Sequence, residues 1–293
     1  MRIFLTGATG FIGSHLTSEL IRNGHDVLGL TRSEAGAQAL RRLGAQTHHG
    51  SLEDLDSLKR GGAASDAVVH CAYDHDFSRS EAIAKLETDA IRTLGAAVAG
   101  SQRPLIITSV CAMGAVTPGE PATEDGYNVY NPRKSTEDAG RAAAEQGANV
   151  SVVRLAQVHN TMRQGFVSGL VAIARERGLS AYVGASSSRW AAVNVLDAAR
   201  LYRLAVEKAA PGAVYHAVGD EGVPLKNIAE TIGQRFGIPV QSITAEEAKE
   251  HFGWLAMFVA MDMAASSQKT QALLDWHPQG AGLLEDLRHS EVS

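Results

Sequence analysis

The sequence predicts an α/β fold of the Rossmann type, a doubly wound parallel sheet with a smaller C-terminal substrate lobe. Short apolar runs alternate with longer periodic segments through the first half of the chain, as in parallel strands joined by crossover helices. A glycine-rich turn follows the first apolar run directly and opens a helical segment, which is the order of elements that begins a dinucleotide-binding fold. Of the 293 residues 45% are hydrophobic and 20% are charged, so the chain can form a buried core.

Apolar runs of strand length mark the expected sheet. Five of them show little alternation, as strands buried on both faces do, at residues 3–6, 27–31, 67–71, 105–109 and 150–155, and a weaker run lies at 46–48. Crossover helices are predicted at residues 12–22, 35–43, 52–59, 81–99 and 136–146. Beyond about residue 157, helical stretches at 167–177 and 196–207 mix with short strands near Tyr182 and at 214–217. We therefore expect a dinucleotide-binding core over residues 1–156 and a substrate lobe over 157–293 with segments that return to the core.

The glycines at positions 7, 10 and 13 predict the binding site for a dinucleotide pyrophosphate. Gly7 lets the chain turn tightly off the first strand, Gly10 removes a side chain that would block the approach of the phosphates, and Gly13 lets the helix pack against the sheet. The helix N-terminus offers free N–H groups and the positive end of its dipole to the phosphates. The other residues of the turn that we expect at the cofactor are Thr9, Phe11 and Ile12.

The end of the second strand favours NADP(H) over NAD(H). An NAD-specific site usually places an acidic residue there, whereas this chain has Arg32 and Ser33, a cation and a hydroxyl that suit a 2′-phosphate. Arg32 could also be a solvated loop residue, and NAD(H) stays an alternative. Because loops at the strand ends line the cofactor in this fold, the remaining expected contacts are Ser51, Leu52, Ala72, Tyr73, Thr108, Leu155 and Val158.

Charge and composition argue against several other classes of protein. The formal net charge is −5 and no run of Lys or Arg occurs, which disfavours a nucleic-acid partner. No apolar run approaches the ~20 residues of a membrane span, and the two cysteines, Cys71 and Cys111, lie in apolar runs, so we expect a soluble cytoplasmic protein with buried thiols. The eleven histidines show no ligand spacing, and no nucleophile elbow is present, so neither a metal site nor a hydrolase is predicted.

Several separate motifs resemble the short-chain dehydrogenase/reductase superfamily, in particular its extended, epimerase-like branch. They are TGATGFIG at 6–13, VHCA at 69–72, IITS at 106–109 with the segment up to Gly114, VVRL at 152–155, VNVLDAA at 193–199 and LLDWHP at 273–278. The resemblance covers nearly the whole chain. It implies a nicotinamide-dependent enzyme with a small-molecule substrate, and a homodimer is the usual expectation for such an enzyme.

The resemblance also implies a catalytic set of Ser109, Tyr130 and Lys134. The family uses a Tyr that exchanges a proton with the substrate oxygen and a Lys four residues later, a spacing that places both on one helix face. Residues 130–134 satisfy Tyr-x-x-x-Lys literally, and Ser109 lies about twenty residues upstream, where its hydroxyl could bind the same oxygen.

A second alignment of this segment leads to a different set. Pro132 is favoured at the first position of a helix with Asn131 as its cap, which leaves Tyr130 before the helix. Many members of the family have Ser-Pro directly before the Tyr, and aligning the prolines places Arg133 in the Tyr position and Glu137 in the Lys position. The alternative groups at the substrate are then Tyr127, Tyr73, His159 and Arg133.

Three functions fit these observations. The first is an NADP(H)-dependent oxidoreductase that reduces a carbonyl or oxidises a secondary alcohol of a small organic substrate. The second is a nucleotide-sugar epimerase or dehydratase with tightly bound NAD, although residues 155–160 lack the Pro and Tyr-Gly usual in such enzymes. The third is a non-catalytic NAD(P)-binding sensor, which the second alignment would allow.

Overall fold

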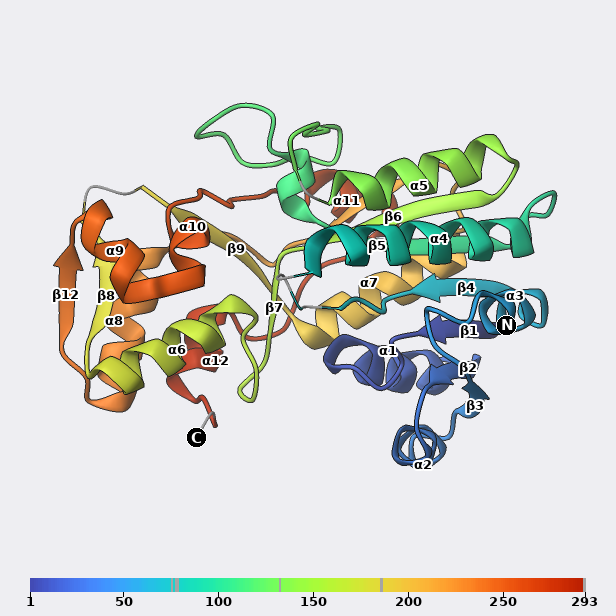
Figure 1. Cartoon of the computed structure of the whole chain (residues 1–293), viewed down its shortest axis with the longest axis horizontal. Coiled ribbons are helices and arrows are strands. Elements are labelled where there is room, and N and C mark those ends of the chain that lie inside the picture. The colour runs from blue at the N-terminus through green and yellow to red at the C-terminus, as the bar shows by residue number, and fades with distance from the viewer. Residues whose placement is uncertain (75, 77–78, 132, 185–186, 292–293) are drawn as a thin grey trace.

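A seven-stranded parallel sheet forms the larger body of the molecule (Figure 1). The computed structural model describes residues 1–293 except 75, 77–78, 132, 185–186 and 292–293. The strand order is β10-β6-β5-β4-β1-β2-β3, and neighbouring strands pair in parallel. The strands are β1 (Arg2–Thr6), β2 (Asp26–Thr31), β3 (Gln46–His49), β4 (Ala67–His70), β5 (Pro104–Val110), β6 (Asn149–Leu155) and β10 (Val214–Ala217). The predicted doubly wound fold is thus confirmed.

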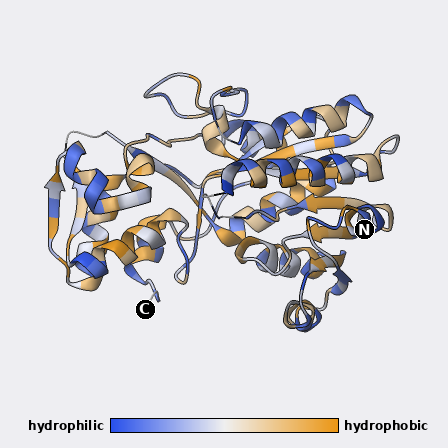
Figure 2. Ribbon diagram, in the orientation of Figure 1, coloured by the Kyte–Doolittle hydropathy of each residue, from blue (hydrophilic) through white to orange (hydrophobic). Residues whose placement is uncertain are grey.

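Helices cover both faces of this sheet. One face carries α1 (Phe11–Arg22), α2 (Glu34–Arg42) and α7 (Val195–Lys208), and the other carries α3 (Leu55–Ala63), α4 (Ser80–Val98) and α5 (Lys134–Glu145). Successive strand residues enter opposite layers, so Ile106 packs in the α1 and α7 layer while Ile107 packs in the α4 and α5 layer. Figure 2 shows apolar residues along the strands and polar residues on the outward helix faces.

The smaller body lies beyond one end of the sheet and has a core of its own (Figure 1). Its helices are α6 (Phe166–Arg177), α8 (Leu225–Phe236), α9 (Ala245–Phe252), α10 (Ala256–Val259) and α12 (Leu283–Arg288), and its two-stranded sheet pairs β8 (Ser180–Val183) with β12 (Val240–Ile243). A three-stranded sheet of β7 (Gln157–His159), β9 (Arg189–Asn194) and β11 (Asp220–Pro224) runs between the two bodies. Two short 3-10 helices, η2 (Cys111–Gly114) and η3 (Gly253–Leu255), and helix α11 (Gln268–Leu274) complete the described elements.

Segments from the second half of the chain return to the larger body. Strand β10 adds the edge of the main sheet beside β6, and α7 packs against α1. Trp276 follows α11 and is fully buried in the same core cluster, where its indole N–H donates to the Asp197 carbonyl at 3.1 Å. The larger body is therefore built from both halves of the chain.

Two negative findings concern the described part of the chain only. None of its helices combines the length and apolar character that a membrane crossing requires. Nor does any group of three or more His, Cys, Asp or Glu side chains in it have the arrangement of a metal site.

Candidate active site

The C-terminal edge of the main sheet collects the residues that the sequence predicts at the cofactor. Because the strands run parallel, Thr6 of β1 pairs with His70 of β4, and Ser109 of β5 pairs with Arg154 of β6. The turn of residues 7–13 follows β1, residues 32–33 follow β2, 51–52 follow β3, 72–73 follow β4, and 155–158 span the step from β6 to β7. A crevice at this edge is where ligands bind in open α/β sheets.

The glycine turn has the geometry that a pyrophosphate site needs. Gly7 adopts φ +71°, and a Cβ there would lie 2.7 Å from the Ala72 nitrogen, while a Cβ on Gly13 would lie 2.0 Å from the Gly7 carbonyl oxygen. These two glycines let the turn close on itself. A Cβ on Gly10 would meet only that carbonyl oxygen, at 3.1 Å, so the outer side of the turn at the N-terminus of α1 is free for a ligand.

The rim of this edge at β2 and β3 carries the residues expected at the ribose. Arg32 is exposed, and with Ser51 and Glu53 it lines a surface hollow. A hydrogen bond from Ser51 lowers the pKa of Glu53, and the charge of Arg32 lowers it further. Ser33 caps α2, its side chain accepting from the Gly36 nitrogen at 3.1 Å, and Leu52 packs against the core.

A chain of hydrogen bonds ties the end of β4 to the turn. The hydroxyl of Thr6 lies 2.9 Å from Nδ1 of His70 and accepts from the Ala72 nitrogen at 3.2 Å. Burial lowers the pKa of His70 to about 4, and the charge of Arg133 acts in the same direction. Neutral His70 therefore belongs to the scaffold that holds Ala72 and Tyr73 beside the glycine turn.

The last residues of β5 point to opposite sides of the sheet. The Thr108 hydroxyl donates to the His70 carbonyl at 2.7 Å and lies 2.7 Å from the Tyr202 hydroxyl, which belongs to α7. Ser109 therefore faces the side of α4 and α5. It is 1% exposed, and its Oγ has no hydrogen-bond partner among the described residues. A buried unpaired hydroxyl is costly, so Ser109 is a candidate to bind a ligand.

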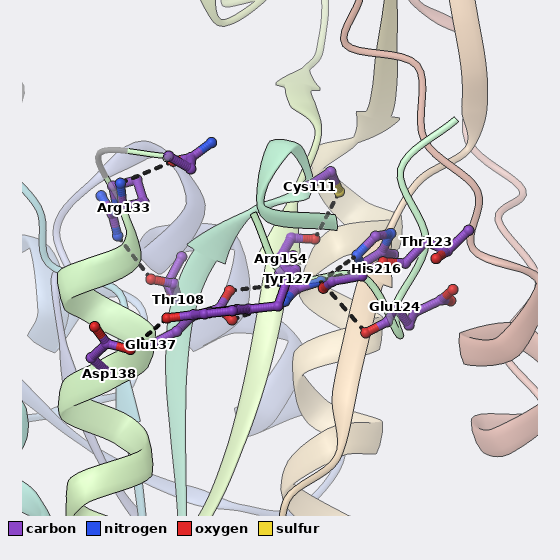
Figure 3. Close-up of polar contacts among 12 residues, drawn as sticks. Thr108, Cys111, Thr123, Glu124, Tyr127, Arg133, Glu137, Asp138, Arg154 and His216 are labelled. Atoms are coloured by element: carbon purple, nitrogen blue, oxygen red, sulfur yellow. Dashed lines mark hydrogen bonds and ion pairs between the residues drawn. The ribbon is translucent and has the colours of Figure 1, made fainter. Parts of the chain in front are cut away.

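Arg133, just before α5, reaches this same end of β5. Its Nη2 donates to Oε1 of Glu87 at 2.8 Å and to the Thr108 carbonyl at 2.9 Å. Its guanidinium lies over the Tyr73 ring, 3.9 Å from the centroid, and its Nε is buried without a partner among the described residues. Figure 3 shows Arg133 extending from the start of α5 toward Thr108.

Tyr130 and Lys134 share no hydrogen bond or ion pair with this cluster among the described residues. Tyr130 is 92% exposed and precedes α5, which begins at Lys134, so helical spacing does not relate the two residues. Lys134 forms an ion pair with Asp138 on its own helix. The Tyr-x-x-x-Lys match therefore does not put these side chains beside buried Ser109. Pro132, on which the second alignment rests, lies outside the described residues, and the Asn131 side chain accepts from the Arg133 nitrogen at 2.9 Å.

Two of the alternative candidates have other partners. Tyr127 donates to Asp138, and partial burial together with this hydrogen bond raises its pKa to about 12. His159 is fully buried, with Nδ1 2.7 Å from the Asp286 carboxylate of α12, and burial lowers its pKa. Leu155 and Val158, expected at the cofactor, pack against the main core cluster. Tyr73 and Arg133 are the alternatives that lie together at the end of β5.

A second buried cluster lies beneath the loop that leads to α5. Arg154 donates from Nε and Nη2 to the two carboxylate oxygens of Glu137, each at 2.8 Å (Figure 3). Its Nη1 also donates to the Gly126 carbonyl at 2.9 Å. Nη1 lies 3.4 Å from Nε2 of His216, whose pKa burial lowers to about 4. Glu124 accepts from the nitrogen and the hydroxyl of Thr270.

The sequence analysis missed Glu87. This carboxylate is buried on the apolar stripe of α4, in line with Ile83, Ile91 and Leu94. A carboxylate at such a position requires a partner, because an unpaired buried charge is strongly unfavourable. That pattern could have predicted a buried cation nearby, and the cation is Arg133.

The comparisons with known proteins agree with this fold. The family model described as NAD dependent epimerase/dehydratase family matches residues 3–219. A protein of Schizosaccharomyces pombe described as uncharacterized is 44% identical over 98% of both chains. The sterol-4-alpha-carboxylate 3-dehydrogenase, decarboxylating, of Dictyostelium discoideum is 26% identical over 75% of this chain and 72% of its own.

Solved structures share the fold. The UDP-glucose 4-epimerase of Thermotoga maritima superposes with a TM-score of 0.77 at 21% identity, covering 99% of this chain and 97% of that one. The chain belongs to the NAD dependent epimerase/dehydratase family. The resemblance predicted from its motifs is thereby confirmed, and with it a nicotinamide-dependent enzyme family.

Proposed function

We propose that this protein is an NADP(H)-dependent oxidoreductase that reduces a carbonyl or oxidises a secondary alcohol of a small organic substrate. The observation that carries the proposal is the buried hydroxyl of Ser109, which has no partner among the described residues and lies at the same sheet edge as the glycine turn. A nicotinamide bound at this edge supplies or accepts hydride. Ser109 donates a hydrogen bond to the substrate oxygen and so stabilises the charge that develops there.

The residues proposed to hold the cofactor surround the strand ends. The phosphates dock on the glycine turn and the N-terminus of α1, where Gly10 leaves space. Arg32 and Ser33 bind the 2′-phosphate, and the remaining contacts come from Thr9, Phe11, Ile12, Ser51, Leu52, Ala72, Tyr73, Thr108, Leu155 and Val158. NAD(H) stays the competing cofactor because Glu53 lies close to Arg32.

Cofactor preference is tested by titration with NADPH and NADH followed by fluorescence. Replacing Arg32 by alanine should weaken NADPH binding about 10- to 100-fold, the value of a charged hydrogen bond, and leave NADH binding unchanged. Arg41→Ala is the matched control, since Arg41 is an exposed arginine of α2 that pairs with Glu34. Equal affinity of the wild type for the two cofactors would overturn the preference.

The role of Ser109 is tested by carbonyl reduction in a panel of aldehydes and ketones. Ser109→Ala should lower turnover about 100-fold, the effect of losing one hydrogen-bond donor to a developing oxyanion. Ser65→Ala removes another buried hydroxyl, one that donates to the Gly61 carbonyl before β4, and should leave turnover unchanged. A loss of less than a few-fold in Ser109→Ala would sink this assignment.

Adding nucleotide sugars to the panel, and comparing turnover with cofactor binding, separates the competing functions. Turnover of a nucleotide sugar without added cofactor would favour an epimerase or dehydratase with bound NAD. Tight NADPH binding without any turnover would favour a sensor. We further propose a homodimer in the cytoplasm, which sedimentation of the purified protein and localisation of a tagged chain would test.

A further inference from the structure

We infer that Arg133 binds the substrate oxygen beside Ser109, with Glu87 as its positioning residue, in place of the tyrosine and lysine that the resemblance implies. The inference rests on the proposed function above and adds the group that carries the charge of the reaction.

Two side chains at the end of β5 carry buried donors that the described residues leave unused. Nη2 of Arg133 donates to Glu87 and to the carbonyl of Thr108, the residue directly before Ser109. The Nε–H of Arg133 and the Oγ–H of Ser109 are both buried without a partner among the described residues. One donor belongs to the side chain that binds the Thr108 carbonyl and the other to the residue that follows Thr108, so an acceptor oxygen placed between them would satisfy both.

Ser109, Glu87 and Arg133 lie on the same face of the sheet. Because Thr108 directs its hydroxyl to Tyr202 of α7, the next residue, Ser109, directs its own to the opposite face. Glu87 of α4 and Arg133 before α5 lie on that face. The donors thus come from β5 and from the residue before α5, at the edge that carries the glycine turn.

Glu87 makes a charged arginine tolerable at this position. The Arg133 and Glu87 side chains are 15% and 5% exposed, and Thr136 donates to the second oxygen of Glu87 at 2.7 Å. Burial raises the pKa of Glu87, whereas the charge of Arg133 and the hydrogen bond from Thr136 lower it. The Tyr73 ring holds the plane of the guanidinium from one side. The guanidinium is therefore oriented before any substrate arrives, as electrostatic catalysis requires.

The chemistry follows from these donors. When the carbonyl carbon receives hydride from a reduced nicotinamide, the electron pair of the C=O bond moves onto oxygen. Arg133 Nε–H and Ser109 Oγ–H stabilise that negative oxygen, and water supplies the proton that completes the alcohol. Arg133 acts in this scheme as a hydrogen-bond donor and transfers no proton. No phenol takes part in this scheme.

The first test compares two arginines of the same segment. Arg133→Met should lower turnover of the best carbonyl substrate about 10²- to 10³-fold with NADPH affinity unchanged. Arg141→Met is the control, because Arg141 also lies over a tyrosine ring, that of Tyr127, at 3.5 Å. Calorimetry of the product alcohol with protein and NADP+ gives a readout without turnover, and Arg133→Met alone should lose this binding.

Chemical rescue separates a direct role from a structural one. Millimolar guanidinium should restore at least part of the turnover of Arg133→Ala and none of that of Ser109→Ala. Glu87→Gln should lower turnover about tenfold, less than loss of the arginine itself, because the donor remains but is less firmly held. If Arg133→Met does not fold, the double variant Arg133→Met, Glu87→Met removes both charges and should show the same loss of turnover.

The pH profile provides the decisive contrast. Turnover of the wild type should stay level up to the alkaline range, while Arg133→Tyr should acquire an alkaline decline from its new phenol. An alkaline decline in the wild type that Tyr73→Phe abolishes would overturn the inference, as would unchanged turnover in Arg133→Met or a parallel loss of NADPH binding. If the wild type reduces no carbonyl at all, the proposed function fails, whatever the variants show.

Discussion

Two buried arginine–glutamate pairs flank α5, and they differ in how completely their hydrogen bonds are satisfied. Arg154 uses Nε and Nη2 on Glu137 and Nη1 on backbone carbonyls, so each of its nitrogens has a partner. Arg133 leaves Nε without one among the described residues, and so does Ser109, the residue after the Thr108 carbonyl that Arg133 binds, for its hydroxyl. We take this difference as the mark of scaffold in one pair and of a ligand site in the other, because most buried donors in proteins are paired.

The largest effect should come from breaking the pair of Arg154 and Glu137, in which each arginine nitrogen has a partner. Arg154→Met leaves the Glu137 carboxylate and several carbonyls buried without their donor, and the free energy of unfolding should fall by about 3–5 kcal/mol. Chemical denaturation of the wild type and the variant measures this loss in the free energy of unfolding. The double variant Arg154→Met, Glu137→Met should recover part of the loss, since no charge stays buried alone. A loss below about 1 kcal/mol in the single variant would contradict the scaffold role.

The next effect concerns acid stability of the same cluster. The pKa of His216 is lowered to about 4 in the folded protein, against 6.5 for an ordinary histidine. The unfolded chain therefore binds a proton below pH 6.5 that the folded chain refuses, so stability falls as the pH drops from 6.5 toward 4. The expected slope is about 1 kcal/mol per pH unit.

A glutamine at His216 should remove this share of the pH dependence. The measurement is the free energy of unfolding in urea at pH 7, 6 and 5 for the wild type and for His216→Gln. His289→Gln, at an exposed histidine, serves as the control. Identical slopes in wild type and His216→Gln would show that another group, such as His70, carries the acid sensitivity.

The smallest effect is expected at the residues that satisfy the sequence motif. Tyr130→Phe and Lys134→Ala should each change turnover less than about threefold, because Tyr130 is exposed and Lys134 is engaged with Asp138. Lys134→Ala removes a surface ion pair of an i, i+4 type and should cost about 0.3–0.5 kcal/mol of stability. A loss of turnover near 100-fold in Tyr130→Phe would restore the tyrosine mechanism and break the contrast between the two pairs.

The larger body could be predicted from sequence because its strands are apolar runs between periodic segments. The boundaries were less certain: the helix expected from residue 52 begins at Leu55, since Asp54 caps it by accepting from the Ser57 nitrogen. In the second half, β12 carries almost no apolar pattern because it lies exposed at an edge, and it was not predicted. Helix α8 was missed although Leu225, Ile228 and Ile232 form an apolar stripe.

The sequence predicts those residues of the site that lie at the end of a single strand. Ser109 and the glycine turn follow from strand ends, where parallel pairing fixes the edge. The spacing from Tyr130 to Lys134 does not by itself define the site, because a four-residue interval places side chains together only inside a helix, and α5 begins at Lys134. The pairing of Glu87 with Arg133 joins positions 46 apart in sequence, and no local pattern encodes such a contact.

The return of the chain to its first body has a consequence for how the protein is made. Strand β10 closes the sheet beside β6, and Trp276 completes the core cluster only near the end of the chain. During synthesis on the ribosome, the edge of the sheet at β6 therefore stays unpaired until residues 214–217 have been made. The core cluster of the N-terminal half stays incomplete until Trp276 has been made. Such an edge is a template for pairing with other chains. A message that stops early would thus release an aggregation-prone fragment instead of a small dinucleotide-binding protein.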